Sequence, residues 1–218
     1  MGNFTRLLII NIIVIIVLIG GGAAGYYYYD QATNYVKTDN AVVGGQAISI
    51  AAPVSGKLTS WSASQGKNFD ANDTVGNIEA VGADGKPVKT AVKMPQTATI
   101  AQNAGTKNTF VAAGTQLAQA YNLHELYITA NIDETDIENV KAGQKVDISI
   151  DAFPGTSFTG KVDQIGTATA STFSLIPSSN SNGNYTKVSQ VVPVKIKLDG
   201  YKGEKLLPGM NVTVKIHI

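Results

Sequence analysis

Few side chains in this sequence have the types and spacing that enzyme chemistry requires. The 218 residues include two histidines, His124 and His217, and no cysteine. Thiol catalysis, disulfides and thiolate zinc sites are therefore excluded. The histidines are too far apart to pair by local spacing, so we interpret both as structural or surface residues. Motifs of serine hydrolases, zinc proteases and phosphate-binding loops are missing. We expect a protein that is not an enzyme and has no metal or cofactor.

The densest group of carboxylates consists of Asp133, Glu134, Asp136 and Glu138. The glycine and ligand spacing of a calcium loop are missing from it. We interpret the run as the start of one short helix over Glu134–Lys141, stabilised by N-capping and by first-turn charges that complement the helix dipole. Gly143 can terminate that helix.

Composition excludes a further class of partner. Lys and Arg total 17 against 16 Asp and Glu, with no basic stripe interleaved with aromatics, so nucleic acid is not expected. Trp61 has the side chain of a sugar platform, but we favour packing in a core.

The first secondary-structure element that the sequence predicts is an apolar helix near the N-terminus. Leu7–Gly25 carries no charge, and nineteen helical residues span about 28 Å, the thickness of a bilayer core. Arg6 precedes the run and Asp30 follows it, which favours a cytoplasmic N-terminus and an extracytoplasmic bulk. The alternative is a cleaved signal peptide, but the cleavage site is poor. Inside the helix, Asn11 is a candidate for hydrogen bonding to a partner helix.

An internal repeat follows the helix. Seven positions recur 42 residues later: Pro53, Gly56, Leu58, Gly66, Phe69, Asn72 and Val75 match Pro95, Ala98, Ile100, Asn108, Val111, Gly114 and Leu117. Because Gly and Asn most readily adopt positive φ, both copies predict a left-handed turn at Gly66 and Asn108. Two interlocked copies would form a β-sandwich.

The C-terminal part alternates between apolar and polar residues. Lys145–Asp151, Thr186–Asp199 and Met210–Ile218 each place apolar side chains on one face. These strands predict a small antiparallel β-barrel. We therefore expect a mainly β chain with four parts. Residues 1–25 would form a cytoplasmic stub and a transmembrane helix, and residues 26–46 a linker or strand. Residues 47–122 would form the sandwich, with a short hairpin at 79–90, and residues 123–218 the barrel.

The repeat resembles the half-motif of biotinyl/lipoyl domains, through Ala52-Pro53-x-x-Gly56 and Gly66-x-x-Phe69-x-x-Asn72-x-x-Val75. That resemblance raises the alternative of a carrier modified on lysine. Lys86 lies near the corresponding hairpin, but it lacks the flanking residues of such motifs. We therefore expect neither biotin nor lipoate.

The whole chain resembles the membrane fusion proteins, or periplasmic adaptors, of the HlyD/EmrA type. The matching stretches are Thr38–Ala41, Asp133–Ile137, Asp151–Gly155, Thr172–Pro177 and Gly183–Gln190. Relatives from two-membrane bacteria carry a long helical hairpin between the lipoyl halves, whereas here only twelve residues separate Ile78 from Ala91. This difference indicates an adaptor from a single-membrane bacterium.

The resemblance implies a subunit of a drug or solute export pump that binds a polytopic transporter. It favours a proton-driven major-facilitator exporter over an ATP-driven one, and it leaves room for a homo-oligomer. The candidate transporter-binding residues are Asn11, Thr172, Phe173, Ser174, Leu175, Pro177, Gly183, Asn184, Lys187 and Gln190. The alternative function is a stand-alone membrane-anchored surface protein that binds a cell-wall polymer or another extracellular ligand.

Overall fold

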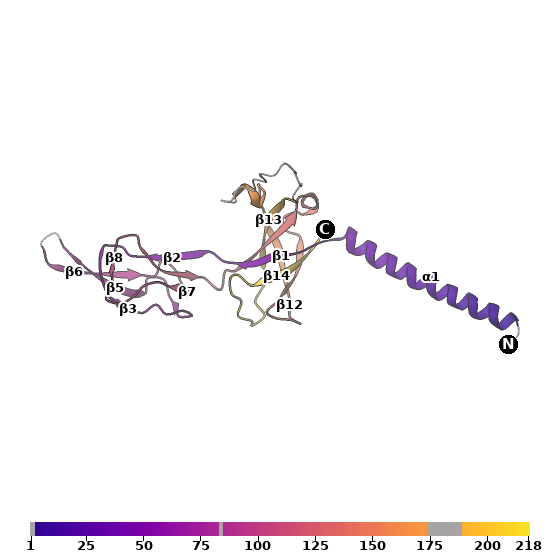
Figure 1. The fold of residues 1–218 in the computed structure, drawn as a ribbon, viewed down its shortest axis with the longest axis horizontal. Coiled ribbons are helices and arrows are strands. Elements are labelled where there is room, and N and C mark those ends of the chain that lie inside the picture. The colour runs from indigo at the N-terminus through magenta and orange to yellow at the C-terminus, as the bar shows by residue number, and fades with distance from the viewer. Residues whose placement is uncertain (1–2, 83–84, 174–188) are drawn as a thin grey trace, which may run out of the picture. The chain divides into compact units, whose positions relative to one another are not determined.

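The computed structural model describes residues 3–82, 85–173 and 189–218. Helix α1 spans Asn3–Thr33 and contains 31 residues, which confirms the predicted N-terminal apolar helix. Figure 1 shows α1 as one unbroken helix. Residues Asn11–Asp30 are long and apolar enough to cross a membrane. The remaining chain forms two compact β units, which are described separately.

The first unit is a closed six-stranded barrel, as predicted. Around the barrel the strands follow the order β1, β10, β13, β12, β11 and β14. Their bounds are β1 Tyr35–Gly44, β10 Tyr127–Asp133, β11 Lys145–Ile150, β12 Ser157–Ile165, β13 Val191–Leu198 and β14 Asn211–His217. Every second residue faces inward, as in β14, where Val212, Val214 and Ile216 are buried. Strand β1 follows the helix and pairs with β14. The first and last strands along the chain are therefore neighbours, and their pairing closes the barrel.

The interior of this barrel is a packed apolar core. Phe158 has no exposed surface, and Ile128, Ile148 and Ile196 are at most 1% exposed. Branched and aromatic side chains from all six strands fill the space between them, as is usual for small barrels. The barrel wall therefore encloses side chains and no channel.

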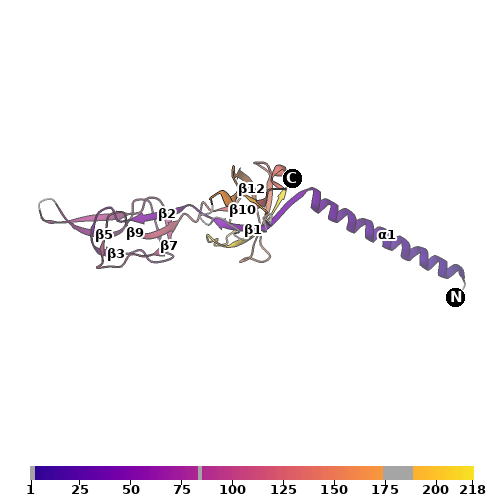
Figure 2. The same cartoon turned by 45° about the horizontal axis from the view of Figure 1, so that its top comes forward.

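The second unit is a sandwich of two four-stranded sheets, with strand orders β2-β9-β7-β4 and β6-β5-β3-β8. The strand bounds are β2 Ala47–Ala51, β3 Gly56–Trp61, β4 Asn68–Phe69, β5 Thr74–Val81, β6 Pro87–Lys93, β7 Ala98–Asn103, β8 Phe110–Val111 and β9 Gln116–Tyr121. Leu58, Val75, Ile78 and Met94 lie in its core with no exposed surface. Figures 1 and 2 show the β5–β6 hairpin projecting beyond the other strands of this unit.

The two copies of the repeat interlock through reciprocal hydrogen bonds. The backbone N–H of Gly66 donates to the carbonyl of Ile100 at 2.8 Å, and the N–H of Asn108 donates to the carbonyl of Leu58 at 2.7 Å. Both turn residues have positive φ, 82° for Gly66 and 69° for Asn108. The left-handed turns predicted from the 42-residue offset are therefore confirmed. Each copy therefore supplies backbone acceptors for the turn of the other.

The short helix of the barrel unit differs from the prediction. The segment after Asp133 forms turns and one 3-10 helix, η1, over Ile137–Asn139, so the short helix expected over Glu134–Lys141 is present but covers only three residues and is of the 3-10 type. The N-capping interpretation is also wrong, because Asp136 makes no side-chain capping hydrogen bond. Val140 is already extended (ψ 129°) and buried. The backbone therefore leaves the helical conformation after Asn139, because the buried Val140 is held in an extended conformation.

Candidate functional site

The predicted transporter-binding segment lies only partly within the described residues. Ser174, Leu175, Pro177, Gly183, Asn184 and Lys187 fall outside them. Thr172 and Phe173 belong to a second 3-10 helix, η2, which spans Ala170–Phe173. Gln190 directly precedes β13. The two described ends of the segment are therefore the 3-10 helix after β12 and the entry to β13.

Hydrogen bonds join these two ends. The hydroxyl of Ser171 donates to the side-chain oxygen of Gln190. Thr169 Oγ1 lies 3.0 Å from Ser171 Oγ and 3.1 Å from Thr172 Oγ1. The structure therefore brings Thr172 and Gln190, two of the predicted residues, into one small polar network on the barrel. Sequence spacing alone gave no sign of this network, because Ser171 and Gln190 are nineteen positions apart.

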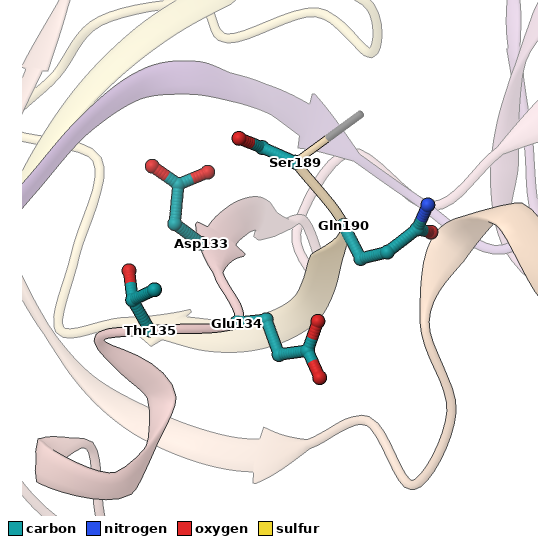
Figure 3. A pocket seen from close by; sticks show the side chains of 5 residues that line it. All are labelled: Asp133, Glu134, Thr135, Ser189 and Gln190. Carbon is teal, nitrogen blue, oxygen red and sulfur yellow. The ribbon is translucent and has the colours of Figure 1, made fainter. Parts of the chain in front are cut away.

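A polar pocket opens beside Gln190. It has a volume of about 470 Å³ and is lined by Asp133, Glu134, Thr135, Ser189 and Gln190. The backbone N–H of Glu134 donates to the carbonyl of Gln190 at 3.0 Å, which ties the end of β10 to the start of β13. Figure 3 shows Asp133 and Ser189 on the same side of the pocket, with Gln190 pointing away from them.

This pocket has two carboxylates but no set of groups for catalysis. Within residues 3–82, 85–173 and 189–218, no three His, Asp or Glu side chains are close enough to hold a metal ion. Its carboxylates, hydroxyls and amide can form hydrogen bonds, and the carboxylates attract positive charge. Such a pocket is suited to binding a polar group of a partner.

The remaining candidate residue, Asn11, lies in α1 and is exposed along with its apolar neighbours. A primary amide on a helix surrounded by hydrocarbon would need a hydrogen-bonding partner from another helix. Asn11 lies in α1, whereas the network of η2 and Gln190 lies on the barrel, so these candidate residues belong to different elements.

The two histidines differ in their surroundings. His124 is exposed, and only its backbone N–H is engaged, with the side chain of Asn122. His217 Nε2 lies 2.7 Å from Asp147 Oδ2, and its ring packs edge-on against Tyr35 at a centroid distance of 4.9 Å. The sequence could not reveal this contact, because Asp147 and His217 meet only through the pairing of β11 with β14. It ties the first residues after the helix to the barrel.

Trp61 belongs to the sandwich core, as favoured from the sequence. Its ring is partly buried against the core cluster, and its Nε1 donates to Asn103 Oδ1 at 2.7 Å. Gly76 and Gly105 both lie against the indole, and a Cβ on either would approach it to within 2.6 Å. The ring is therefore held in place and does not form an open sugar platform.

Two family models match the two β units. The model of the YhbJ barrel-sandwich hybrid domain matches residues 46–122. The model of the YknX-like β-barrel domain matches residues 126–216. Together they cover most of the chain outside the helix, in the order in which the sandwich and the barrel occur.

Relatives extend this match along the whole chain. YhbJ of Bacillus subtilis, described as an efflux system component, is 47% identical over 98% of this chain and 94% of its own length. This chain belongs to the membrane fusion protein family. The colistin resistance protein EmrA of Acinetobacter baumannii is 39% identical over 51% of this chain, but the match covers only 32% of that protein.

Solved structures of the family have the same fold. The periplasmic adaptor protein EmrA superimposes with a TM-score of 0.56 over 84% of this chain and 98% of the solved chain, at 12% identity. At that identity the likeness concerns the fold alone. The names of these relatives describe an efflux system component and a periplasmic adaptor.

Proposed function

We propose that this chain is the adaptor subunit of an export pump for drugs or other solutes, in which it binds and positions a polytopic transporter. The observation that carries the proposal is the 47% identity to an efflux system component over nearly the full length of both chains. The adaptor itself performs no chemistry.

The anchor would hold the adaptor beside its transporter. Helix α1 crosses the membrane with Arg6 on the cytoplasmic side and both β units outside. Tyr26, Tyr27, Tyr28 and Tyr29 are 61–75% exposed. Four consecutive helical residues point in four directions about 100° apart, so these rings surround the helix as an interfacial belt does. This belt supports the placement of the membrane's outer surface just before Asp30.

The packed barrel supports a positioning role. A solute cannot pass through a barrel whose interior is filled by side chains such as Phe158 and Ile148. Any effect of this chain on export must therefore come from surfaces that contact the transporter or a second adaptor. The Ser171–Gln190 network and the adjacent pocket offer one such surface outside the membrane, and Asn11 offers one within it.

The transporter would be a major-facilitator exporter driven by protons. Support comes from the resemblance of Thr172–Pro177 and Gly183–Gln190 to the EmrA branch, and from the relative named EmrA that matches half of this chain. The short β5–β6 hairpin suits a cell with a single membrane, because its β5 and β6 strands extend only from Thr74 to Lys93.

A double substitution tests where the transporter is bound. Phe173→Ser with Leu175→Ser should leave the melting temperature and membrane level unchanged while removing both transporter co-purification and drug resistance. Thr213→Ala on β14, at a half-buried residue away from this segment, is the matched control. A double variant that binds and exports normally would show that this segment is not the contact, and one that unfolds would assign both residues to the core.

A further inference from the structure

Strand pairing aligns three lysines across the barrel wall. Lys145 of β11 lies directly opposite Lys161 of β12, and Lys161 lies directly opposite Lys197 of β13. All three side chains are exposed. We call Lys145, Lys161 and Lys197 the lysine row.

The lysine row has an electrostatic cost within a single chain. Directly opposed side chains on neighbouring strands lie about 5 Å apart at Cβ, where like charges repel. Among the described residues, none of the three lysines forms an ion pair, and the nearby carboxylates Asp147 and Asp163 contact His217 and Lys195 instead. Each lysine also has a carboxylate two residues further along the chain, Asp147, Asp163 or Asp199. The barrel therefore carries three lysines in adjacent positions that form no ion pair among the described residues, a surface that favours an anionic partner.

The three lysines of the row lie at different distances from one end of the barrel. Lys145 is the first residue of β11, Lys161 lies four residues before the end of β12, and Lys197 lies six residues after the start of β13. The start of β11, the end of β12 and the start of β13 lie at the same end of the barrel, because neighbouring strands are antiparallel. It is also the end at which β1 follows the anchor helix, since Tyr35 pairs with His217 near the start of β11.

The same barrel also carries a negatively charged segment that forms no ion pair among the described residues. Asp133, Glu134, Asp136 and Glu138 are all exposed, and no ion pair involves any of them in the part of the chain that the structure describes. We call these four residues the acidic segment. Because Glu134 bonds to Gln190 at the start of β13, the acidic segment lies at the same end of the barrel as Lys145.

We propose that the lysine row of one copy binds the acidic segment of a second copy. The two features have opposite charge, both are exposed, and neither forms an ion pair among the described residues. In copies anchored in one membrane, the acidic segment would lie at the same end of the barrel as Lys145.

Charge reversal and rescue test this contact in the full-length protein in mild detergent. The oligomer distribution of the wild type, measured by native mass spectrometry and analytical ultracentrifugation, should shift toward monomer between about 50 mM and 500 mM salt. Replacement of all three lysines of the row by Glu should weaken association at least about tenfold, and so should replacement of Asp133, Glu134 and Glu138 by Lys. An equimolar mixture of the two reversed variants should associate as the wild type does.

Controls separate this contact from general charge effects. Lys57, Lys93 and Lys107 are exposed lysines of the sandwich, and their replacement by Glu should leave association unchanged. A monomeric wild type, a row variant that associates normally, or a failed rescue between folded variants would each overturn the proposal. Loss of binding to phosphatidylglycerol vesicles by the row variant, with normal association, would point to the membrane surface and would also overturn it. None of these measurements requires a transporter, so the result does not depend on the proposed adaptor role.

Discussion

Trp61 Nε1 donates a 2.7 Å hydrogen bond to Asn103 Oδ1, and the two residues occupy equivalent positions 42 residues apart in the duplicated halves of the sandwich. Each half thus supplies one partner of a bond where the halves meet. Asn103 Oδ1 also accepts the backbone N–H of Gly105 at 3.1 Å. The two halves differ at this position, because one supplies an indole donor and the other an amide acceptor.

Removing the acceptor should weaken the sandwich. Asn103→Ala leaves Trp61 Nε1 without its acceptor, whereas the N–H of Gly105 keeps its 2.8 Å bond to the carbonyl of Leu117. We expect a loss of about 1 kcal/mol in the free energy of unfolding. Urea denaturation followed by tryptophan fluorescence measures it directly, because Trp61 is the sole tryptophan. Gln102→Ala, at an exposed neighbouring position, is the control and should change stability by less than about 0.5 kcal/mol. Equal stability of both variants would show that the bond contributes nothing.

The glycine beside the indole should tolerate no side chain. A Cβ on Gly105 would lie 2.6 Å from Trp61 Cε2, so Gly105→Ala should cost about 1–3 kcal/mol through overpacking. Gly200→Ala meets nothing within 4 Å and is the matched control. In a Trp61→Leu background the cost of Gly105→Ala should fall, because the clashing ring atoms are gone. An unchanged cost in that background would attribute the effect to the backbone instead.

The left-handed turn at Asn108 predicts opposite outcomes for two small residues. At a φ of 69°, Asn108→Gly should preserve or slightly raise stability, whereas Asn108→Ala should lower it by about 1 kcal/mol. Thermal unfolding of the two variants provides the comparison, with Lys107→Ala as a control at the preceding position. Equal melting temperatures for the glycine and alanine variants would contradict a strained backbone at this turn.

Much of the fold could be predicted because its signals are local. Alternation in β11, β13 and β14 identifies barrel strands, and the constant offset of 42 residues identifies two halves whose turns at Gly66 and Asn108 share one backbone conformation. The apolar run before Tyr26 identifies the helix. Each of these features depends on side chains close together in the sequence or on an exact repeat.

The features that escaped prediction depend on strand register. The contact of His217 with Asp147 and the alignment of Lys145 with Lys161 exist only because β11 pairs with both β12 and β14. The short helix predicted over Glu134–Lys141 is reduced to the three residues Ile137–Asn139 for a related reason. Its apolar spacing suits a helix, but the backbone there is bound to Gln190 by the barrel's own closure.

The packed barrel should depend on its largest buried side chain. Phe158 has no exposed surface, so Phe158→Ala should cost about 3–5 kcal/mol and unfold the barrel at lower urea concentration. Phe110 is 80% exposed, and Phe110→Ala should change the stability of the sandwich by less than about 0.5 kcal/mol. Circular dichroism during urea titration distinguishes the two. A small effect at Phe158 would indicate an interior with room to rearrange, which would reopen the question of a passage through the barrel.

The adaptor role is tested most directly by identifying what the full-length protein binds in its native membrane. Mild detergent extraction of a tagged chain, followed by affinity purification and mass spectrometry, should recover one polytopic exporter in amounts comparable to the chain itself. A variant with α1 replaced by an unrelated membrane-spanning helix should retain part of this binding, whereas the Phe173→Ser and Leu175→Ser variant should lose most of it. Recovery of cell-wall polymer or wall-synthesis proteins without any transporter would contradict the adaptor role and favour a stand-alone surface protein.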